Sequence, residues 1–529
     1  MRTGRWLSAI AIIVLLAGAV QKAAAAIYPA EGTVLPFTLM PFSVPAEALA
    51  REYTFCVATG LYDDDRQFAQ NVIATFRSKQ SDCLARLPHW GTQYTWQATC
   101  TDKNGRKISA TGLNHFSTIS ISFVDTTVFR QRSILNTFPD TSLHYFVDAA
   151  RALYDMSGNA VWVLPNIPGH VNMESQIRDL KVTPFHTITF LTDYGAYEVS
   201  YDGRILWSKQ EMDPRTGLPA YRHFHHEFTR LPSGNYMLLG IQKVQRKMTE
   251  LNSGSVAEAR NVIRGANGTY LVVDFGVLQE YTPGGELAWY WNSGDYFSDE
   301  EVFEKLDQTP RLVADGHFNA FYFDSDAKAV YAGFRDRNRI VKISYPDNRI
   351  IAAFGDGTPT GPLFKAQHSC MPGENGELYI FCNNPSRTMP VPPPRGALTP
   401  GERPQSRQMP GTQQEAGYPQ KTQVMVLRQP LSEADTARVV WSFDCDIDDQ
   451  ADHTALREGN AVPLPGGNVL VCMGTTPRIF IVSRDKKLMF NSISEYRPGG
   501  KEPWAPKASY RVSPVTQEQL ERMAMRMLR

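Results

Sequence analysis

The sequence has no excess of charge of either sign. It has 54 lysine and arginine residues against 54 aspartate and glutamate residues over 529 positions, so its formal net charge is zero. Domains that bind nucleic acids normally carry a basic excess, and this balance therefore argues against a nucleic-acid partner. Beyond residue 25 no apolar run reaches about 18 residues, so the mature chain is expected to have no membrane-spanning helix.

Several enzyme motifs are missing as well. There is no Walker loop, no Gly-x-Gly-x-x-Gly after a strand, no Gly-x-Ser-x-Gly and no His-Glu-x-x-His, which argues against nucleotide-binding, serine-hydrolase and zincin sites. None of the seven cysteines stands in a Cys-x-x-Cys pair, which argues against a structural zinc site or a thioredoxin-like redox site. We expect no bound metal and no other cofactor. The spacing permits disulfides between Cys83 and Cys100 and between Cys370 and Cys382.

What the sequence does contain begins with an export signal. Arg2 and Arg5 precede an apolar run over 7–20, and alanines at 23–26 supply small residues for cleavage. This order is typical of a secretory signal peptide, although an uncleaved anchor is the alternative. We expect residues 1–25 to be removed and the mature protein to work in an oxidising compartment, the bacterial periplasm.

Short strands separated by turn residues recur from about residue 185 onward. Segments 190–207 and 271–289 share a pattern of strands, a Gly or Asn turn and a last strand that ends in an aromatic residue. Further copies run over 330–354, 378–443 and 469–490. A unit of about 50 residues with four strands matches one blade of a β-propeller. Five copies are legible and the chain ends can complete a sixth, which predicts an all-β fold with a six-bladed β-propeller.

Two segments lie outside this repeat. Residues 27–160 mix strand and helix signals, with 64–76 helical, and predict a smaller β-rich amino-terminal domain before a propeller domain over 170–515. Residues 385–420 hold nine prolines among polar residues and predict an exposed loop inserted in one blade. The tail over 517–529 reads as a short helix.

Three histidines occupy corresponding places in three copies of the repeat. His226 and His368 each lie eight residues before the glycine of their strand turn, and His317 lies at a similar distance before its own turn. Each place is the start of a first strand, and the inner strands of a propeller surround its central channel. The three imidazoles are therefore expected to face one another. For any one of them alone, a histidine with only local hydrogen bonds is the alternative.

A cation and an amide accompany these histidines. Arg335 follows His317 on the next strand, and Asn319 lies two residues after His317, on the same face. A guanidinium offers bidentate donors to an oxyanion and opposes a dication, so the group favours a tetrahedral oxyanion over zinc. Sulfuryl or phosphoryl transfer with histidine as nucleophile fits this site. The alternation of Arg335, Arg337 and Arg339 also fits an ordinary solvated face.

At these residues the sequence resembles the bacterial arylsulfate sulfotransferases. The likeness covers about residues 180 to 490 and rests on motifs that occur in order: His225-His226-Glu-Phe, His317-Phe-Asn319, Phe334-Arg335 and Gln367-His368. The resemblance implies a periplasmic six-bladed propeller with a β-rich amino-terminal domain. It also implies an enzyme that moves sulfuryl groups between phenols without a nucleotide sulfate donor.

The resemblance assigns roles to the matched residues. It implies that His368 is the histidine that becomes sulfated, and that His317, Asn319 and Arg335 hold the sulfate oxygens. The remaining family positions fall on the pair His225-His226, where the turn spacing favours His226, and on Thr475. A neighbouring imidazole, either His226 or His317, is expected to remove the proton of the acceptor.

The predicted function is transfer of a sulfuryl group from an aryl sulfate to a phenol through a sulfo-histidine, with ping-pong kinetics. The expected partners are these small molecules, with a homodimer left open. Two other functions fit less closely: a secreted propeller that binds a ligand without turnover, and a metal-dependent propeller hydrolase that uses the histidines as ligands. The first predicts no covalent intermediate, and the second predicts sensitivity to chelators.

Overall fold

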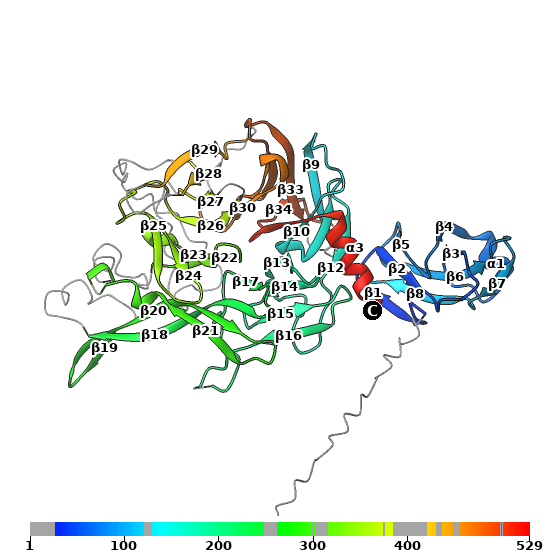
Figure 1. Cartoon of the computed structure of the whole chain (residues 1–529), viewed down its shortest axis with the longest axis horizontal. Coiled ribbons are helices and arrows are strands. Elements are labelled where there is room, and N and C mark those ends of the chain that lie inside the picture. The colour runs from blue at the N-terminus through cyan, green and yellow to red at the C-terminus, as the bar shows by residue number, and fades with distance from the viewer. Residues whose placement is uncertain are drawn as a thin grey trace, which may run out of the picture.

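The protein is built mostly from β-strands (Figure 1). The structure is a computed structural model, and it describes residues 27–120, 128–214, 216–247, 262–298, 300–302, 316–373, 376–384, 421–429, 436–447, 455–497, 499 and 501–528. The predicted signal peptide and the proline-rich segment 385–420 lie outside the described residues. Among the described helices, none has the length and apolar character needed to cross a membrane.

The first part of the chain forms two sheets and one short helix. The larger sheet has the order β1 (Thr33–Leu35), β8 (Asn114–Thr118), β6 (Gln93–Thr101), β3 (Glu52–Thr59) and β4 (Val72–Ser78), with β7 (Lys107–Ala110) also on β6. The smaller sheet pairs β2 (Leu39–Ser43) with β5 (Asp82–Arg86). The helix predicted over 64–76 is shorter, because α1 (Asp65–Gln70) is capped by Asp64 and then gives way to the alternating strand β4.

The rest of the described chain contains six antiparallel sheets, each with a run of four strands. Three of them use the two ends and the first half of this region: β12 (Ala160–Val163), β11 (Ala152–Asp155), β10 (His144–Val147) and β35 (Val512–Val515); β13 (Arg178–Val182), β14 (Ile188–Leu191), β15 (Ala196–Val199) and β16 (Ile205–Lys209); β17 (Phe228–Arg230), β18 (Tyr236–Lys247), β20 (Gly268–Tyr281) and β21 (Leu287–Asn292).

The other three runs follow in chain order: β22 (Phe318–Asp324), β23 (Ala329–Phe334), β24 (Arg339–Ser344) and β25 (Ile350–Gly355); β26 (Gln367–Pro372), β27 (Glu377–Cys382), β28 (Gln423–Arg428) and β29 (Arg438–Asp444); β30 (Asn460–Pro463), β31 (Val469–Cys472), β32 (Arg478–Val482) and β33 (Leu488–Tyr496). Three further strands add to these sheets: β19 (Val262–Gly265) on β20, and β9 (Phe129–Asn136) and β34 (Ala505–Pro506) on β33.

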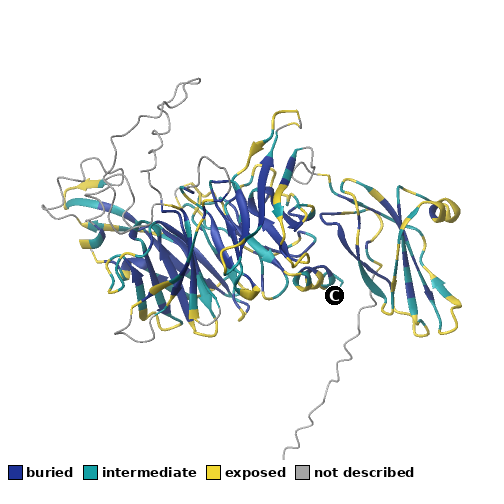
Figure 2. Cartoon of the chain, turned by 90° about the horizontal axis from the view of Figure 1, so that it is seen from above, coloured by how far each residue is buried: buried dark blue, intermediate teal, exposed yellow. Residues whose placement is uncertain are grey.

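Neighbouring sheets contact one another mainly through their innermost strands. Contacts join β22 to β26, β26 to β30, β30 to β35, β35 to β13 and β14 to β17, and a shared apolar cluster joins β18 and β20 to β22 and β23. Figure 1 shows these innermost strands grouped around a common centre. Strands such as β10, β14 and β31 are buried along their whole length, as expected for strands covered on both faces. Figure 2 shows buried strands through the middle of the molecule.

The first and last parts of the chain meet in one sheet. Strand β35 pairs with β10, with Val512 opposite Val147 and Val515 opposite His144. The expected amino-terminal domain over 27–160 therefore differs from the strand pairing: β9 pairs with β33 and β10 with β35, and β11 and β12 belong to the sheet of β10. The change of partner falls between β8 and β9, because the sequence over 144–163 forms short buried strands like those of the later sheets.

The amino-terminal sheets pack on the later ones through an aromatic core. The rings of Phe37 and Tyr201 stack with centroids 4.5 Å apart, and the indole N–H of Trp162 donates to the Tyr201 carbonyl at 2.6 Å. Helix α3 (Gln517–Arg526) agrees with the helix expected in the tail. Thr516 caps it, and it buries Leu520, Met523 and Ala524 in the same core, contacting β2 and β5.

The two expected disulfides are wrong. All seven cysteines, each of which lies among the described residues, are free thiols. The strand register explains one case, because Cys382 lies opposite Gln367 whereas Cys370 lies opposite Ile380. In the other case Cys83 lies on β5 and Cys100 on β6, which belong to different sheets.

Candidate functional site

The site lies where the innermost strands begin. His226 precedes β17, His317 precedes β22, and both adopt a left-handed backbone, with φ of 62° and 57°. The equivalent left-handed residue before β26 is Ala366, with φ of 52°. His368 therefore lies two residues further along its strand, at the place that Asn319 takes in β22. The expected register of three identical positions is thus shared by only two of the histidines.

The three imidazoles nevertheless come together. The ring centroid of His226 is 5.4 Å from that of His317 and 5.8 Å from that of His368. His225, the other half of the pair, contacts His226 through their Nδ1 atoms at 2.5 Å, and its backbone N–H donates to Leu239. Of the two neighbours, His226 is the one that reaches both other histidines.

His368 is held in one tautomer by its hydrogen bond. Its side chain is buried, with 3% of the residue exposed, and Nδ1 lies 3.0 Å from the carbonyl oxygen of Gly459. A carbonyl oxygen only accepts, so Nδ1 carries the proton and Nε2 keeps its lone pair. Burial and the charge of Arg511 lower the pKa of His368 well below its ordinary value. Its imidazole is therefore neutral and nucleophilic at neutral pH.

The half-buried imidazoles of His225 and His226 are neutral as well. Burial and the neighbouring His225 lower the pKa of His226 well below its ordinary value. Burial and the nearby His317 lower the pKa of His225 to about 3. Closely packed imidazoles favour the neutral form of one another, because each added proton would repel the next.

Arg335 and His317 share one carboxylate. The backbone N–H of Arg335 donates to the carbonyl of His317 at 3.0 Å, which places the two residues side by side. Arg335 Nη1 donates to Asp336 Oδ1 at 2.9 Å, and Asp336 Oδ2 lies 3.5 Å from Nδ1 of the 42% exposed His317. Burial raises the pKa of Asp336, but His317 and Arg335 outweigh this effect and lower it to about 2.

The alternating arginines Arg335, Arg337 and Arg339 do not form a solvent-exposed face. Arg337 and Arg339 are buried, and Arg339 donates to Glu301 Oε1 at 2.9 Å. The side chain of Arg335 is 14% exposed, and its Nη2 donates to the carbonyl of Leu456 at 3.0 Å. Its buried Nε has no hydrogen-bond partner among the described residues. Arg335 therefore retains donor capacity at the site.

Asn319 and Thr475 make hydrogen bonds to the backbone segments beside His368 and Arg335. Asn319 is fully buried, and its Nδ2 donates to the carbonyl of Gln367 at 2.8 Å, which joins β22 to the residue before His368. Thr475 Oγ1 accepts from the backbone N–H of Leu456 at 3.1 Å. Thr475 thereby holds the segment whose carbonyl receives Arg335.

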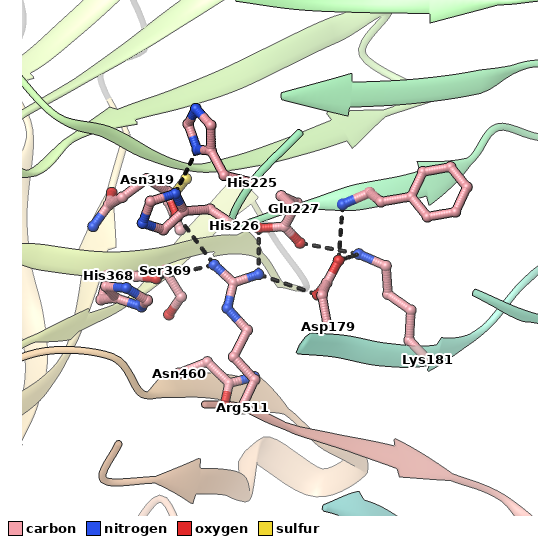
Figure 3. Close-up of polar contacts among 12 residues, drawn as sticks. Asp179, Lys181, His225, His226, Glu227, Asn319, His368, Ser369, Asn460 and Arg511 are labelled. Atoms are coloured by element: carbon pink, nitrogen blue, oxygen red, sulfur yellow. Dashed lines mark hydrogen bonds and ion pairs between the residues drawn. The ribbon is translucent and has the colours of Figure 1, made fainter. Parts of the chain in front are cut away.

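The sequence does not predict the four charged side chains that lie beside the imidazoles (Figure 3). Arg511, which directly precedes β35, donates through Nη1 to Glu227 at 2.6 Å and to Asp179 at 3.2 Å. Lys181 Nζ lies 2.8 Å from Asp179 and 3.0 Å from Glu227. The four groups form two cations and two anions. One signal was present, since Glu227 follows directly after His226, but nothing local pointed to Arg511.

Tyr510 was missed too. Its ring centroid lies 5.4 Å from that of His368 and 6.2 Å from that of His226. Burial raises the pKa of its hydroxyl, so the phenol keeps its proton. Tyr510 therefore adds an aromatic wall to the group of imidazoles.

The described side chains do not form a metal cage. No group of three His, Cys, Asp or Glu residues within the described ranges has a geometry that can hold a metal ion. The cations that adjoin the imidazoles instead suit an anion.

Comparison with known proteins bears on this arrangement. Residues 141–396 match the family model described as Arylsulfotransferase (ASST). This match supports the assignment to the arylsulfotransferase family that the sequence motifs indicate. The matched segment contains His226, His317, Arg335 and His368, and it supports aryl sulfotransferase activity in general terms. Thr475 and Arg511 lie beyond it.

Other comparisons return only distant likenesses, and no curated protein matches the chain. A protein of unknown function from Bacteroides caccae is 12% identical, with 73% of this chain and 99% of that one covered and a TM-score of 0.39. Virginiamycin B lyase from Staphylococcus aureus is 11% identical, with 68% and 88% covered and a TM-score of 0.32. The Myceliophteria thermophila Cps50 (Swd1) β-propeller domain is 9% identical, with 70% and 94% covered and a TM-score of 0.34. At these values the likeness carries no argument about function.

Proposed function

We propose that the protein transfers a sulfuryl group from an aryl sulfate to a phenol, with His368 as the nucleophile. The observation that carries this proposal is the hydrogen bond from His368 Nδ1 to the Gly459 carbonyl, which leaves Nε2 as the reactive atom. The six sheets would be the blades of a closed six-bladed propeller, and the histidines would line one end of its channel. We infer that the protein works in the periplasm, as the family does.

In the first half-reaction Nε2 of His368 attacks the sulfur in line. The N–S bond forms while the S–O bond to the aryl group breaks, and its electron pair leaves with the phenolate oxygen. Arg335 supports this step because each of its terminal nitrogens makes one hydrogen bond and keeps a second N–H for a sulfuryl oxygen. The amide of Asn319 carries a second N–H that can serve the same purpose.

In the second half-reaction the acceptor phenol attacks the sulfo-histidine. The new O–S bond forms, and the electron pair of the N–S bond returns to Nε2 of His368. We assign the proton of the acceptor to His317, because the Asp336 carboxylate beside its Nδ1 stabilises the imidazolium that results. His226 is the weaker candidate, since its lowered pKa makes it a poor proton acceptor.

Mass spectrometry of the enzyme with donor alone tests the proposal. The protein is mixed with 4-nitrophenyl sulfate, quenched rapidly without acid and measured intact. We expect one sulfuryl adduct per chain, located by peptide mapping between Phe364 and Cys370 and discharged when a phenol is added. Initial rates should give parallel double-reciprocal lines, and a chelator should change neither adduct nor rate.

The matched control is His170→Asn, which replaces an exposed histidine that packs on Tyr197. This variant should form the adduct normally. Steady turnover without an adduct, or an adduct on another residue, would remove His368 from the nucleophile role. Tight binding of the aryl sulfate without any release of phenol would indicate a binding protein, and loss of activity with a chelator would indicate a metal-dependent hydrolase.

A further inference from the structure

We propose that Arg511 is the positioning residue of this site: its guanidinium sets where His368 stands relative to His226 and Asn319. The proposal rests on the sulfotransfer function proposed above and adds a residue to it. Arg511 lies outside the segment matched by the family model. Its role is argued from what its two terminal nitrogens contact.

All four terminal N–H groups of Arg511 are engaged, while its buried Nε has no hydrogen-bond partner among the described residues. Nη2 donates to the main-chain carbonyl of His368 at 3.3 Å and to that of Asn319 at 3.3 Å. Nη1 donates to Glu227 Oε2 at 2.6 Å and to Asp179 Oδ1 at 3.2 Å. Both terminal nitrogens thus make two contacts each, and the side chain is 4% exposed. The guanidinium has no terminal N–H left for a substrate.

These partners come from different sheets (Figure 3). His368 belongs to β26 and Asn319 to β22, Asp179 belongs to β13, and Glu227 follows His226 just before β17. Arg511 itself precedes β35, so one planar group spans five of the six antiparallel sheets that follow the amino-terminal sheets in the described residues. Because the fork of a guanidinium is rigid, its position dictates the spacing of the atoms it holds.

The groups that Arg511 contacts belong to the proposed catalytic residues or to their neighbours in the chain. The two carbonyls belong to the proposed nucleophile and to the residue beside it, and one carboxylate belongs to the neighbour of His226. A shift of Arg511 therefore moves all three imidazole-bearing segments together, because Glu227 follows His226 and Asn319 lies two residues after His317. Group transfer is sensitive to such shifts, since a misplacement of about 1 Å can cost about 10²-fold in rate. The charge of Arg511 also favours neutral His368, which supports the assignment.

The chain offers a matched control in Arg151. This arginine is equally buried, and it donates to the main-chain carbonyls of Asn172, Leu164 and Pro165, away from the imidazoles. Arg511→Lys and Arg151→Lys each keep the positive charge but lose the planar set of guanidinium N–H donors. Both variants should lose thermal stability, and only the first should lose catalytic rate.

The test is single-turnover sulfation of the full chain by 4-nitrophenyl sulfate. We expect Arg511→Lys to sulfate His368 about 10²-fold more slowly than wild type, with the donor KM within about twofold. We expect Arg151→Lys to match wild type in both. A general loosening of the fold would slow both variants alike, so this split between kcat and KM reports positioning.

A second variant tests the proposal if Arg511→Lys does not fold. Glu227→Gln keeps the size of the side chain and removes one charged anchor of the guanidinium, and it should slow sulfation about tenfold. The proposal is overturned if neither foldable variant is slower than Arg151→Lys, or if the loss lies wholly in KM. If wild type itself forms no adduct, the proposed function fails first, so the two failures are distinguishable.

Discussion

The edge of the site around Arg335 and its floor around Arg511 use the same side chain in different ways. Each terminal nitrogen of Arg335 makes one hydrogen bond, to Asp336 and to the Leu456 carbonyl. Each terminal nitrogen of Arg511 makes two. The floor pairs its two cations with two carboxylates, whereas the edge has a single carboxylate that Arg335 shares with His317.

This contrast separates binding from positioning. A guanidinium whose terminal N–H groups are all used cannot also hold a substrate oxyanion, whereas Arg335 keeps donors for one. Two carboxylates on the floor compensate the charges of Arg511 and Lys181. We therefore assign the transition-state contact to the edge and the alignment of strands to the floor. The predictions below test this division.

The largest effect is expected at the group that the two regions share. His368→Asn should lower turnover by more than about 10³-fold, because the nucleophile is lost while an amide can keep the hydrogen bond to Gly459. Acceptor-dependent release of 4-nitrophenol measures the loss, and circular dichroism checks the fold. Turnover within tenfold of wild type would mean that another residue receives the sulfuryl group.

Arg335→Lys is expected to have the next largest effect. A lysine keeps the charge but cannot reproduce a guanidinium donor set, so kcat should fall about 10²–10³-fold. The control is Arg349→Lys, an exposed arginine paired with Asp347, which should behave as wild type. If the two variants were equally active, Arg335 would belong to the scaffold like Arg511, and the division between edge and floor would be wrong.

Much of the fold follows from local patterns, and the remainder depends on long-range pairing. The sequence predicts the strands within 190–207, 330–354 and 469–490 because strand and turn residues alternate there with a regular spacing. It does not predict the domain boundary, because β10 to β12 follow the amino-terminal sheet in the chain and only their pairing with β35 reveals their sheet. A partner more than 300 residues away leaves no local signal.

The site residues also fall into those that local patterns predict and those that depend on long-range pairing. His226, His317, Arg335 and His368 stand in repeated places and short motifs, so the sequence could bring them together. Arg511 stands in no repeat and acquires its role only when the end of the chain returns to β10. The disulfides failed for a related reason: spacing along the chain does not reveal strand register.

A smaller effect is expected from the carboxylate of the edge. Asp336→Asn preserves shape but removes the charge between Arg335 and His317, at a cost near that of one charge-assisted hydrogen bond, about 1.5 kcal/mol. We expect kcat to fall about tenfold, with the larger share in discharge of the sulfo-enzyme by phenol, because His317 is the assigned base. Rapid-quench measurement of the two half-reactions separates these steps. Asp347→Asn, on the exposed pair with Arg349, provides the comparison, and an equal loss in it would argue against a role for Asp336.

The smallest effect is that of pH on sulfation, and its sign follows from the charges facing His368. Burial comes first, and Arg511, Arg335 and His317 add to it, whereas the Gly459 carbonyl acts in the opposite direction. The net result is a pKa well below the ordinary 6.5, so the reactive neutral imidazole persists as the pH falls through that value. Single-turnover sulfation should therefore change less than about twofold between pH 7.5 and 5.5, where an ordinary imidazole would become about nine-tenths protonated.

The same measurement on the lysine variants returns to the two arginines. Arg335→Lys and Arg511→Lys both retain a positive charge near His368. In each variant the maximal sulfation rate should be lower, but the pH below which that rate declines should stay under 5.5. The maximal rate should fall through a lost substrate contact in the first variant and through misalignment in the second. If the rate of the Arg511 variant instead began to fall near pH 6.5, water would have entered the floor. Burial is the main cause of the low pKa of His368, and this result would show that it depends on the guanidinium of Arg511.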